Sequence, residues 1–233
     1  MNTAVSISAR HLSVGYDTKV VQPDISFDLH KGEMVCMLGR NGCGKSTLLR
    51  TLAKLQPPLS GTFHIDDVAV VLTDRLSLEN TTIREVVAMG RYPYTSFLGT
   101  LTDEDQRIID NAMEATGCKQ KNAMFNAMSD GEKQRVLIAK ALAQQTPVIL
   151  LDEPTAHLDL PNRILILKLL RTLAHDRNKT ILISTHELEL ALRLADRILL
   201  MSDNGAELDT PDNLRQRDAF TRAFGMNIFD LDI

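Results

Sequence analysis

The chain has 233 residues, of which 44% are hydrophobic and only 4% aromatic, so we expect one globular domain with a sizeable aliphatic core. Its 26 basic and 30 acidic residues give a net charge of −4, which argues against nucleic acid held by bulk charge. No apolar run approaches the roughly 18 residues of a membrane span, and no cleavable leader pattern follows Met1, so we expect neither a membrane-spanning nor a secreted protein.

The first thirty residues alternate apolar and polar positions around the turn signals Gly15 and Gly32, which predicts antiparallel strands. Further along, short and continuously apolar runs predict strands that are covered on both faces. These runs cover 33–38, 147–151, 180–184 and 197–201. Helical periodicity alternates with them over 45–55, 102–116, 130–144, 161–175 and 187–195. The alternation predicts an α/β fold with a mostly parallel sheet.

One segment departs from this alternation. Pro57 and Pro58, followed by Ser60 and Gly61, mark a boundary after the first helix. The pattern from Ile83 onward is then nearly all helical. We therefore expect a helical subdomain over about 83–144, inserted in a single domain that covers 1–233.

A glycine-rich loop at 39–47 (GRNGCGKST) follows the first apolar strand and opens a helix. It fits the phosphate-loop pattern GxxxxGK[ST], in which backbone N–H groups and the helix N-terminus face phosphates. Lys45 is predicted to reach the β- and γ-phosphates, and the Ser46 hydroxyl to bind Mg²⁺. A chance glycine-rich turn is the alternative, which the flanking strand and helix disfavour. The predicted nucleotide contacts here are Gly39, Asn41, Gly42, Cys43, Gly44, Lys45, Ser46 and Thr47.

Polar residues also follow the next two apolar strands. Asp152 is expected to hold Mg²⁺ through water, and Glu153 to polarise a water for attack on the γ-phosphate. The alternative for this pair is a strand end with solvated acids. His186 follows the strand at 180–184 and is expected to hydrogen-bond the γ-phosphate and orient the water. A lone histidine there is more often structural, but this one is predicted at the same end of the sheet as the other motifs.

With these motifs in place, the chain resembles the ATP-binding cassette (ABC) ATPases. The segment 128–136 (MSDGEKQRV) resembles the ABC signature and the start of its helix, and it precedes Asp152 as in the family. The resemblance implies a P-loop NTPase fold with a small N-terminal antiparallel β-subdomain. It also implies that Tyr16 stacks on adenine, that Asp159 lies in the D-loop and that His186 is the switch histidine.

The resemblance further implies a homodimer. In this fold the signature helix is remote from its own phosphate loop. Ser129 and the Gly131 N–H are therefore expected to cap ATP that a second copy holds, head to tail.

Several segments resemble the iron(III)-siderophore, haem and cobalamin importer branch of the family, namely 90–94 (GRYPY), 101–105 (LTDED), 129–135 (SDGEKQR) and 159–163 (DLPNR). In that branch two ATPases dock on a membrane permease dimer, and a substrate-binding protein delivers cargo from outside. The resemblance thus implies ATP and Mg²⁺ as cofactors and a peripheral place on the cytoplasmic face of the inner membrane, with the segment 85–110 touching the permease. An exporter ATPase and a soluble ABC protein are the alternatives.

The chain departs from the family pattern in three places. The signature usually reads Leu-Ser-Gly-Gly-Gln, so Asp130 and Glu132 are acids where neutral residues are usual. The usual Q-loop glutamine is missing, and its position falls near Thr73 or Asp74. Asp74 is the better candidate for a magnesium ligand because carboxylates are hard oxygen donors, while a plain surface loop is the alternative. The stretch from Gly61 to Val71 is shorter than usual, so the antiparallel subdomain is expected to be trimmed.

Two smaller features carry expectations of their own. Ser129 and Glu132 have the spacing of a capping box at a helix start. Cys43 lies in a positive loop, so its thiol is either unusually acidic or simply a small group that fits there.

Overall fold

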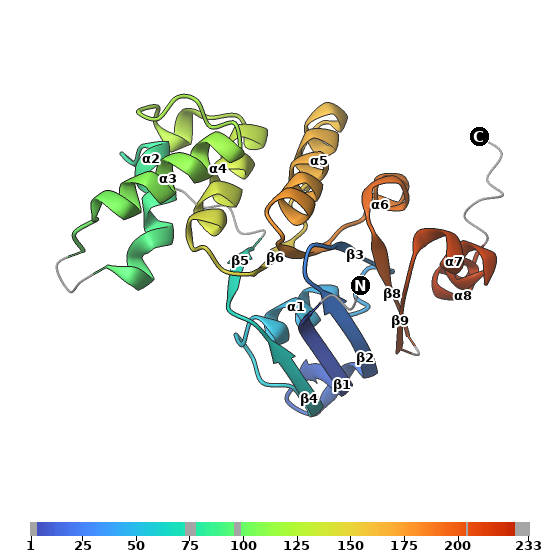
Figure 1. The fold of residues 1–233 in the computed structure, drawn as a ribbon. Helices are drawn as coiled ribbons and strands as arrows, with labels where there is room; N and C mark the ends of the chain where they lie inside the picture. The colour runs from blue at the N-terminus through green and yellow to red at the C-terminus, as the bar shows by residue number, and fades with distance from the viewer. Residues whose placement is uncertain (1–3, 73–77, 96–98, 204, 227–233) are drawn as a thin grey trace.

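The computed structural model describes residues 4–72, 78–95, 99–203 and 205–226, and it contains two sheets with helices around them (Figure 1). The smaller sheet is antiparallel, in the order β2-β1-β4. It consists of β1 (Val5–Tyr16), β2 (Lys19–His30) and β4 (Ser60–Ile65). The predicted antiparallel N-terminal sheet is thus confirmed.

The larger sheet has six strands in the order β5-β6-β7-β3-β8-β9. In chain order they are β3 (Met34–Leu38), β5 (Val68–Val71), β6 (Val148–Asp152), β7 (Thr180–Ser184), β8 (Arg197–Ser202) and β9 (Gly205–Asp209). All neighbouring strands pair in parallel except β8 and β9, which are antiparallel. The short segment 60–71 therefore contributes one strand to each sheet, because β4 pairs with β1 and β5 pairs with β6.

The larger sheet is buried on both faces, as its continuous apolar strands predict. In β3, Met34, Cys36 and Leu38 face one hydrophobic cluster, while Val35 and Met37 face another. The first cluster includes residues of α4, α5 and α8, and the second includes the antiparallel sheet and α1. Both clusters are largely aliphatic, which confirms the expectation from the composition.

The helices that pack on these sheets are α1 (Lys45–Leu52), α5 (Leu160–Asp176), α6 (Leu188–Leu194), α7 (Pro211–Gln216) and α8 (Ala219–Phe224). Helix α1 is shorter than predicted: it ends at Leu52, because Lys54 takes a left-handed conformation (φ 59°) in the turn that leads to Pro57 and Pro58. None of the described helices combines the length and the apolarity that crossing a bilayer requires.

The remaining helices gather at the β5 end of the larger sheet (Figure 1). They are α2 (Ile83–Ala88), the 3₁₀ segment η1 (Met89–Tyr94), α3 (Asp103–Ala115), η2 (Phe125–Ala127) and α4 (Asp130–Ala143). They share a third hydrophobic cluster, in which Val87, Ile109, Phe125 and Ala139 are almost fully buried. The far end of α4 also meets the sheet through Ile138 and Ala141, so α4 links this helical group to the core.

Candidate active site

The phosphate loop lies between β3, whose residues are all buried, and α1. Gly42 and Gly44 have φ of 81° and 96°, a left-handed region that favours glycine. A Cβ at Gly44 would also lie 3.0 Å from Val21, whereas a Cβ at Gly42 would meet nothing within 4 Å. The loop is therefore packed against β2 on one side and open on the other, with Asn41 exposed.

Lys45 is buried within this loop. Its Nζ donates hydrogen bonds to the carbonyl oxygens of Gly39 at 2.9 Å and Arg40 at 3.2 Å. The ammonium is thus held inside the curve of the loop, where carbonyl partners can be exchanged for phosphate oxygens. This position supports the role that the sequence predicts for Lys45.

Of the two interpretations of Cys43, the structure does not support the unusually acidic thiol. Its side chain is buried against Gly39, and a Cβ built on Gly39 would lie 2.7 Å from the Cys43 sulfur. Burial raises the pKa of the Cys43 thiol above its usual value, and the nearby Lys45 charge opposes this only in part. The alternative interpretation, a small residue that fits the loop, agrees with the structure.

Ser46 and Asp152 bring two oxygen ligands together at the start of α1. The Ser46 hydroxyl donates to Asp152 Oδ1 at 3.1 Å, and Asp152 lies almost buried at the end of β6. Within the described residues there is no group of three or more acidic, histidine or cysteine side chains that could hold a metal. Mg²⁺ needs fewer, because it is usually bound by one or two hard oxygen ligands together with phosphates and waters. A hydroxyl and a carboxylate at this distance fit that requirement.

Glu153 and His186 meet at the same edge of the sheet. His186 Nε2 and Glu153 Oε1 are 2.6 Å apart, and both side chains are partly exposed. Glu153 has φ of 47°, which is unusual for a residue with a side chain. The strand ends therefore place a carboxylate and an imidazole together, facing solvent beside the candidate magnesium ligands.

Ser184 is a member of this cluster that the sequence analysis missed. Its hydroxyl donates to Asp152 Oδ1 at 2.6 Å and accepts a hydrogen bond from the Glu153 N–H at 2.9 Å. The available sequence signal was a polar residue at the end of an apolar strand. That signal does not predict a contact with Asp152 by itself, because the contact depends on the pairing of β6 with β7, which puts Ser184 directly opposite Asp152.

Tyr16 lies at the end of β1, beside the start of α1. Its hydroxyl is 3.2 Å from the Thr47 hydroxyl, while about half of the side-chain surface is exposed. The antiparallel sheet thus presents an aromatic ring next to the phosphate loop, which agrees with the adenine contact that the resemblance implies.

The signature residues lie at the start of α4. Ser129 is the N-cap, and the predicted capping box with Glu132 is confirmed: the Ser129 hydroxyl accepts from the Glu132 N–H, and the Glu132 carboxylate accepts from the Ser129 N–H at 3.0 Å. The hydroxyl also donates to Glu132 Oε2 at 2.7 Å. These bonds from Ser129 hold the pKa of Glu132 below its usual value.

The signature adjoins the D-loop. A Cβ at Gly131 would lie 2.8 Å from the Asn162 side chain, and the Asp159 carboxylate caps α5 by accepting the Asn162 N–H at 3.0 Å. Gly131 therefore lets α4 approach the start of α5. Thr73 and Asp74 lie outside the described residues.

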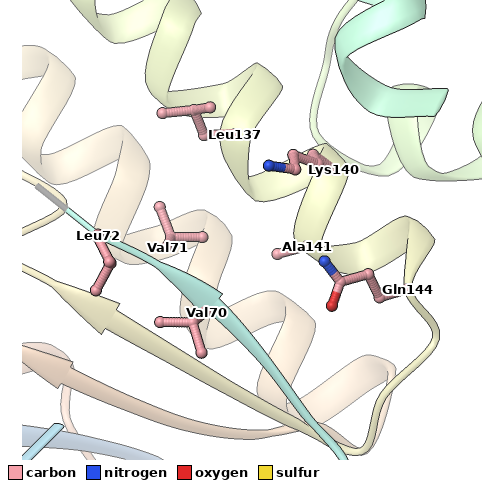
Figure 2. A pocket seen from close by; sticks show the side chains of 7 residues that line it. All are labelled: Val70, Val71, Leu72, Leu137, Lys140, Ala141 and Gln144. Carbon is pink, nitrogen blue, oxygen red and sulfur yellow. The ribbon is translucent and has the colours of Figure 1, made fainter. Parts of the chain in front are cut away.

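A cavity of about 190 Å³ lies between β5 and α4 (Figure 2). Figure 2 shows the side chains of two separate elements around it: Val70, Val71 and Leu72 at the end of β5, and Leu137, Lys140, Ala141 and Gln144 on α4. The space between the helical group and the sheet is thus incompletely filled at the point where the chain leaves β5.

A buried ion pair joins η1 to α3. Arg91 Nε donates to Asp105 Oδ1 at 2.8 Å, and both side chains are about 7% exposed. Arg91 also donates to the carbonyl of Ala143 at 2.9 Å, at the end of α4. Next to this anchor, Tyr92 and Tyr94 are more than half exposed. Bonds from Thr102, joined by Arg91, lower the pKa of Asp105 from 3.8 to about 2.

Comparison with known proteins gives consistent matches. Residues 23–156, more than half of the chain, match a family model described as ABC transporter. The chain is 38% identical to an uncharacterised ABC transporter ATP-binding protein of Methanocaldococcus jannaschii, over 94% of this chain and 81% of that protein. It is 36% identical to the iron(3+)-hydroxamate import ATP-binding protein of Bacillus subtilis, over 91% and 87%. An inward-facing ABC transporter structure classed as metal-chelate type matches with a TM-score of 0.88 and 29% identity, over 95% and 90%.

Proposed function

The chain belongs to the ABC transporter family, and from this premise we propose that it is the ATP-hydrolysing subunit of an importer for a metal chelate. One observation carries the hydrolytic part: Ser46, Asp152, Ser184, Glu153 and His186 form a hydrogen-bonded cluster directly beside the phosphate loop. This cluster and the loop together supply what phosphoryl transfer to water requires, namely phosphate positioning, metal ligands and a base.

The phosphate loop binds and orients the nucleotide. Its backbone N–H groups and Lys45 face the phosphates, and Tyr16 covers the base. Mg²⁺, when bound, neutralises phosphate charge, and Ser46 and Asp152 are the residues that would hold it. We keep Asp74 as a proposed additional ligand.

Glu153 and His186 act on the attacking water. The Glu153 carboxylate accepts a proton from the water. His186, which is hydrogen-bonded to that carboxylate at 2.6 Å, orients the water and reaches the γ-phosphate. Both side chains are open to solvent, so a water has access to them.

The second copy completes the site. Ser129, Gly131 and Asp159 contact the nucleotide that the partner's phosphate loop holds, so that ATP joins two copies and hydrolysis separates them. We propose one domain over 1–233, with the helical subdomain at 83–144 carrying the signature to the partner.

The transport role extends this proposal to separate chains. Two copies dock, through the segment 85–110, on a membrane permease at the cytoplasmic face, and a substrate-binding protein delivers cargo to that permease from outside. The exposed Tyr92 and Tyr94, anchored by the buried Arg91–Asp105 pair, support this surface. The relative named for iron(3+)-hydroxamate import and the metal-chelate type structure support the class of cargo. We propose no nucleic acid partner.

Reconstitution tests this function. The subunit is combined in vesicles with its permease and binding protein, and ATP-driven movement is measured for an iron(III)-hydroxamate, haem and cobalamin. Uptake of one metal chelate that depends on ATP supports the proposal. Movement in the export direction would indicate an exporter instead, and failure to bind any multi-span permease would favour a soluble ABC ATPase.

A further inference from the structure

Ser184 links the two residues that end the neighbouring strand. Its side chain is fully buried at the end of β7, directly opposite Asp152 in the parallel pairing, so the two side chains leave the same face of the sheet. The Ser184 hydroxyl donates its one hydrogen bond to Asp152 Oδ1, and its oxygen accepts a hydrogen bond from the Glu153 N–H. A single buried group therefore contacts the proposed magnesium ligand and the backbone of the proposed base.

We propose that Ser184 is a positioning residue for ATP hydrolysis, which orients the Asp152 carboxylate toward the metal and the Glu153 backbone toward the water. The inference rests on the magnesium and nucleotide roles proposed above. It concerns a residue that is not among the nucleotide or metal contacts proposed above.

The Asp152 carboxylate is anchored at one oxygen by two hydroxyls. Oδ1 accepts from Ser184 at 2.6 Å and from Ser46 at 3.1 Å, and rotating the carboxylate would break both bonds. Because the Ser46 hydroxyl donates its hydrogen bond to Asp152, the lone pairs of the Ser46 oxygen remain available to a cation. The bond from Ser184 is the shorter of these two, and Ser184 is more deeply buried than Ser46, so the loss of Ser184 removes the stronger of the two anchors.

Ser184 also holds Glu153 in its unusual conformation. A residue with φ of 47° persists where neighbouring contacts hold it, and the bond from the Glu153 N–H to Ser184 is one such contact. Without this bond the Glu153 backbone can relax and carry its carboxylate away from His186. Misplacing a catalytic group by about 1 Å can cost up to ~10²-fold in rate, so this small change has a measurable effect.

The test replaces Ser184 by alanine and by threonine, in the full chain. For Ser184→Ala we expect kcat for ATP to fall about tenfold while KM changes little. Binding of a fluorescent ATP analogue without Mg²⁺ should stay unchanged, because the phosphate loop is intact. The factor by which Mg²⁺ increases the affinity of Ser184→Ala for this analogue should be several-fold smaller than in wild type. Ser184→Thr keeps the hydroxyl and should restore most of both properties.

Thr180→Val is the matched control. Thr180 is buried on the same strand, and its hydroxyl donates to the His30 carbonyl at 3.1 Å, at the opposite end of β7. Its loss should lower the melting temperature without changing the response to Mg²⁺. If Thr180→Val changes that response as much as Ser184→Ala does, a general loss of stability explains both and the proposal is wrong.

The binding measurement distinguishes a failure of the magnesium assignment from a failure of the role proposed for Ser184. A wild-type chain whose nucleotide affinity is the same with and without Mg²⁺ would contradict the magnesium assignment. A normal wild-type response that Ser184→Ala leaves unchanged, with unchanged kcat, would contradict the role of Ser184 alone.

Discussion

Glu153 combines an unfavourable backbone with two specific contacts. A left-handed conformation costs a residue with a side chain on the order of 1 kcal/mol, and such cost is commonly found at functional sites. Here the N–H is bonded to Ser184 and the carboxylate to His186, which together fix where the carboxylate points. This arrangement fits the role of base proposed for Glu153, and it comes at some expense of local stability.

Replacing this carboxylate should separate binding from hydrolysis. Glu153→Gln keeps the shape of the side chain but removes the base, so we expect ATP binding to persist while turnover falls at least about a hundredfold. Size exclusion with ATP should then show an accumulated dimer. Glu189→Gln, an exposed acid on α6, is the control and should behave as wild type. Wild-type turnover in Glu153→Gln would exclude Glu153 from the role of base.

Glu132 competes with phosphate for one hydroxyl. The Ser129 hydroxyl donates to the Glu132 carboxylate at 2.7 Å, yet the proposed dimer needs the same proton for the partner's ATP. A bond to a carboxylate is roughly twice as strong as a bond to a neutral acceptor. In the proposed dimer, this acid therefore stabilises the free form of the signature and repels the incoming phosphate.

We expect Glu132→Gln to strengthen ATP-driven dimerisation a few-fold, because the hydroxyl is released more easily and one negative charge is removed. The helix should lose at most about 1 kcal/mol, since the amide can still cap it. Glu85→Gln is the matched control, because Thr82 and Glu85 form the same capping box at α2. Dimerisation measured by light scattering decides the question: weakening in Glu132→Gln would mean that the carboxylate itself is required.

At the level of whole elements, three helices of the helical group begin in the same way. Thr82, Thr102 and Ser129 each cap a helix, and each forms a capping box with the acid three residues later. This spacing is visible in the sequence, because a capping box depends only on local geometry. The buried partner of the second box, Arg91, could not be inferred in this way, because it comes from another segment and meets Asp105 only through packing.

The pKa of Asp105 gives a prediction about the start of α3. Because the folded pKa of about 2 lies below the ordinary value of 3.8, the ionised carboxylate stabilises the fold above about pH 4, and this stabilisation is lost as the pH falls toward 2. Asp105→Asn should therefore melt at a lower temperature than wild type at pH 7, and the difference should shrink between about pH 4 and 2.

Asp103→Asn is the control, because Asp103 is in the same turn but exposed. At pH 7 it should lower the melting temperature much less than Asp105→Asn does. The melting temperatures of the three proteins are compared over this pH range. A constant difference between Asp105→Asn and wild type down to pH 2 would mean that the contacts with Thr102 and Arg91 do not stabilise the ionised form of Asp105.

For the whole molecule, the sequence predicted the fold class, the antiparallel N-terminal sheet and the main strands, because continuous apolar runs and a phosphate loop with correct flanks are strong local signals. It could not predict the strand order, which depends on contacts between distant segments. The contacts of Ser184 with Asp152 and Glu153 were hidden for the same reason: they follow from the pairing of β7 with β6, not from the neighbours of Ser184 in the chain. Likewise, nothing local indicated that the segment 60–71 divides between two sheets.

The proposed head-to-tail dimer predicts that two inactive variants rescue each other. Lys45→Ala disables the phosphate loop of its own copy, and Ser129→Ala disables the signature that serves the partner. A mixed dimer then contains one site with both defects and one with neither, because each site takes its loop and its signature from different copies. Equal mixing makes half of the dimers mixed, so about a quarter of wild-type ATPase activity should return. Mixing Lys45→Ala with a Lys45→Ala, Ser129→Ala double variant is the control and should return none. If each copy used its own signature, the first mixture would stay as inactive as its components.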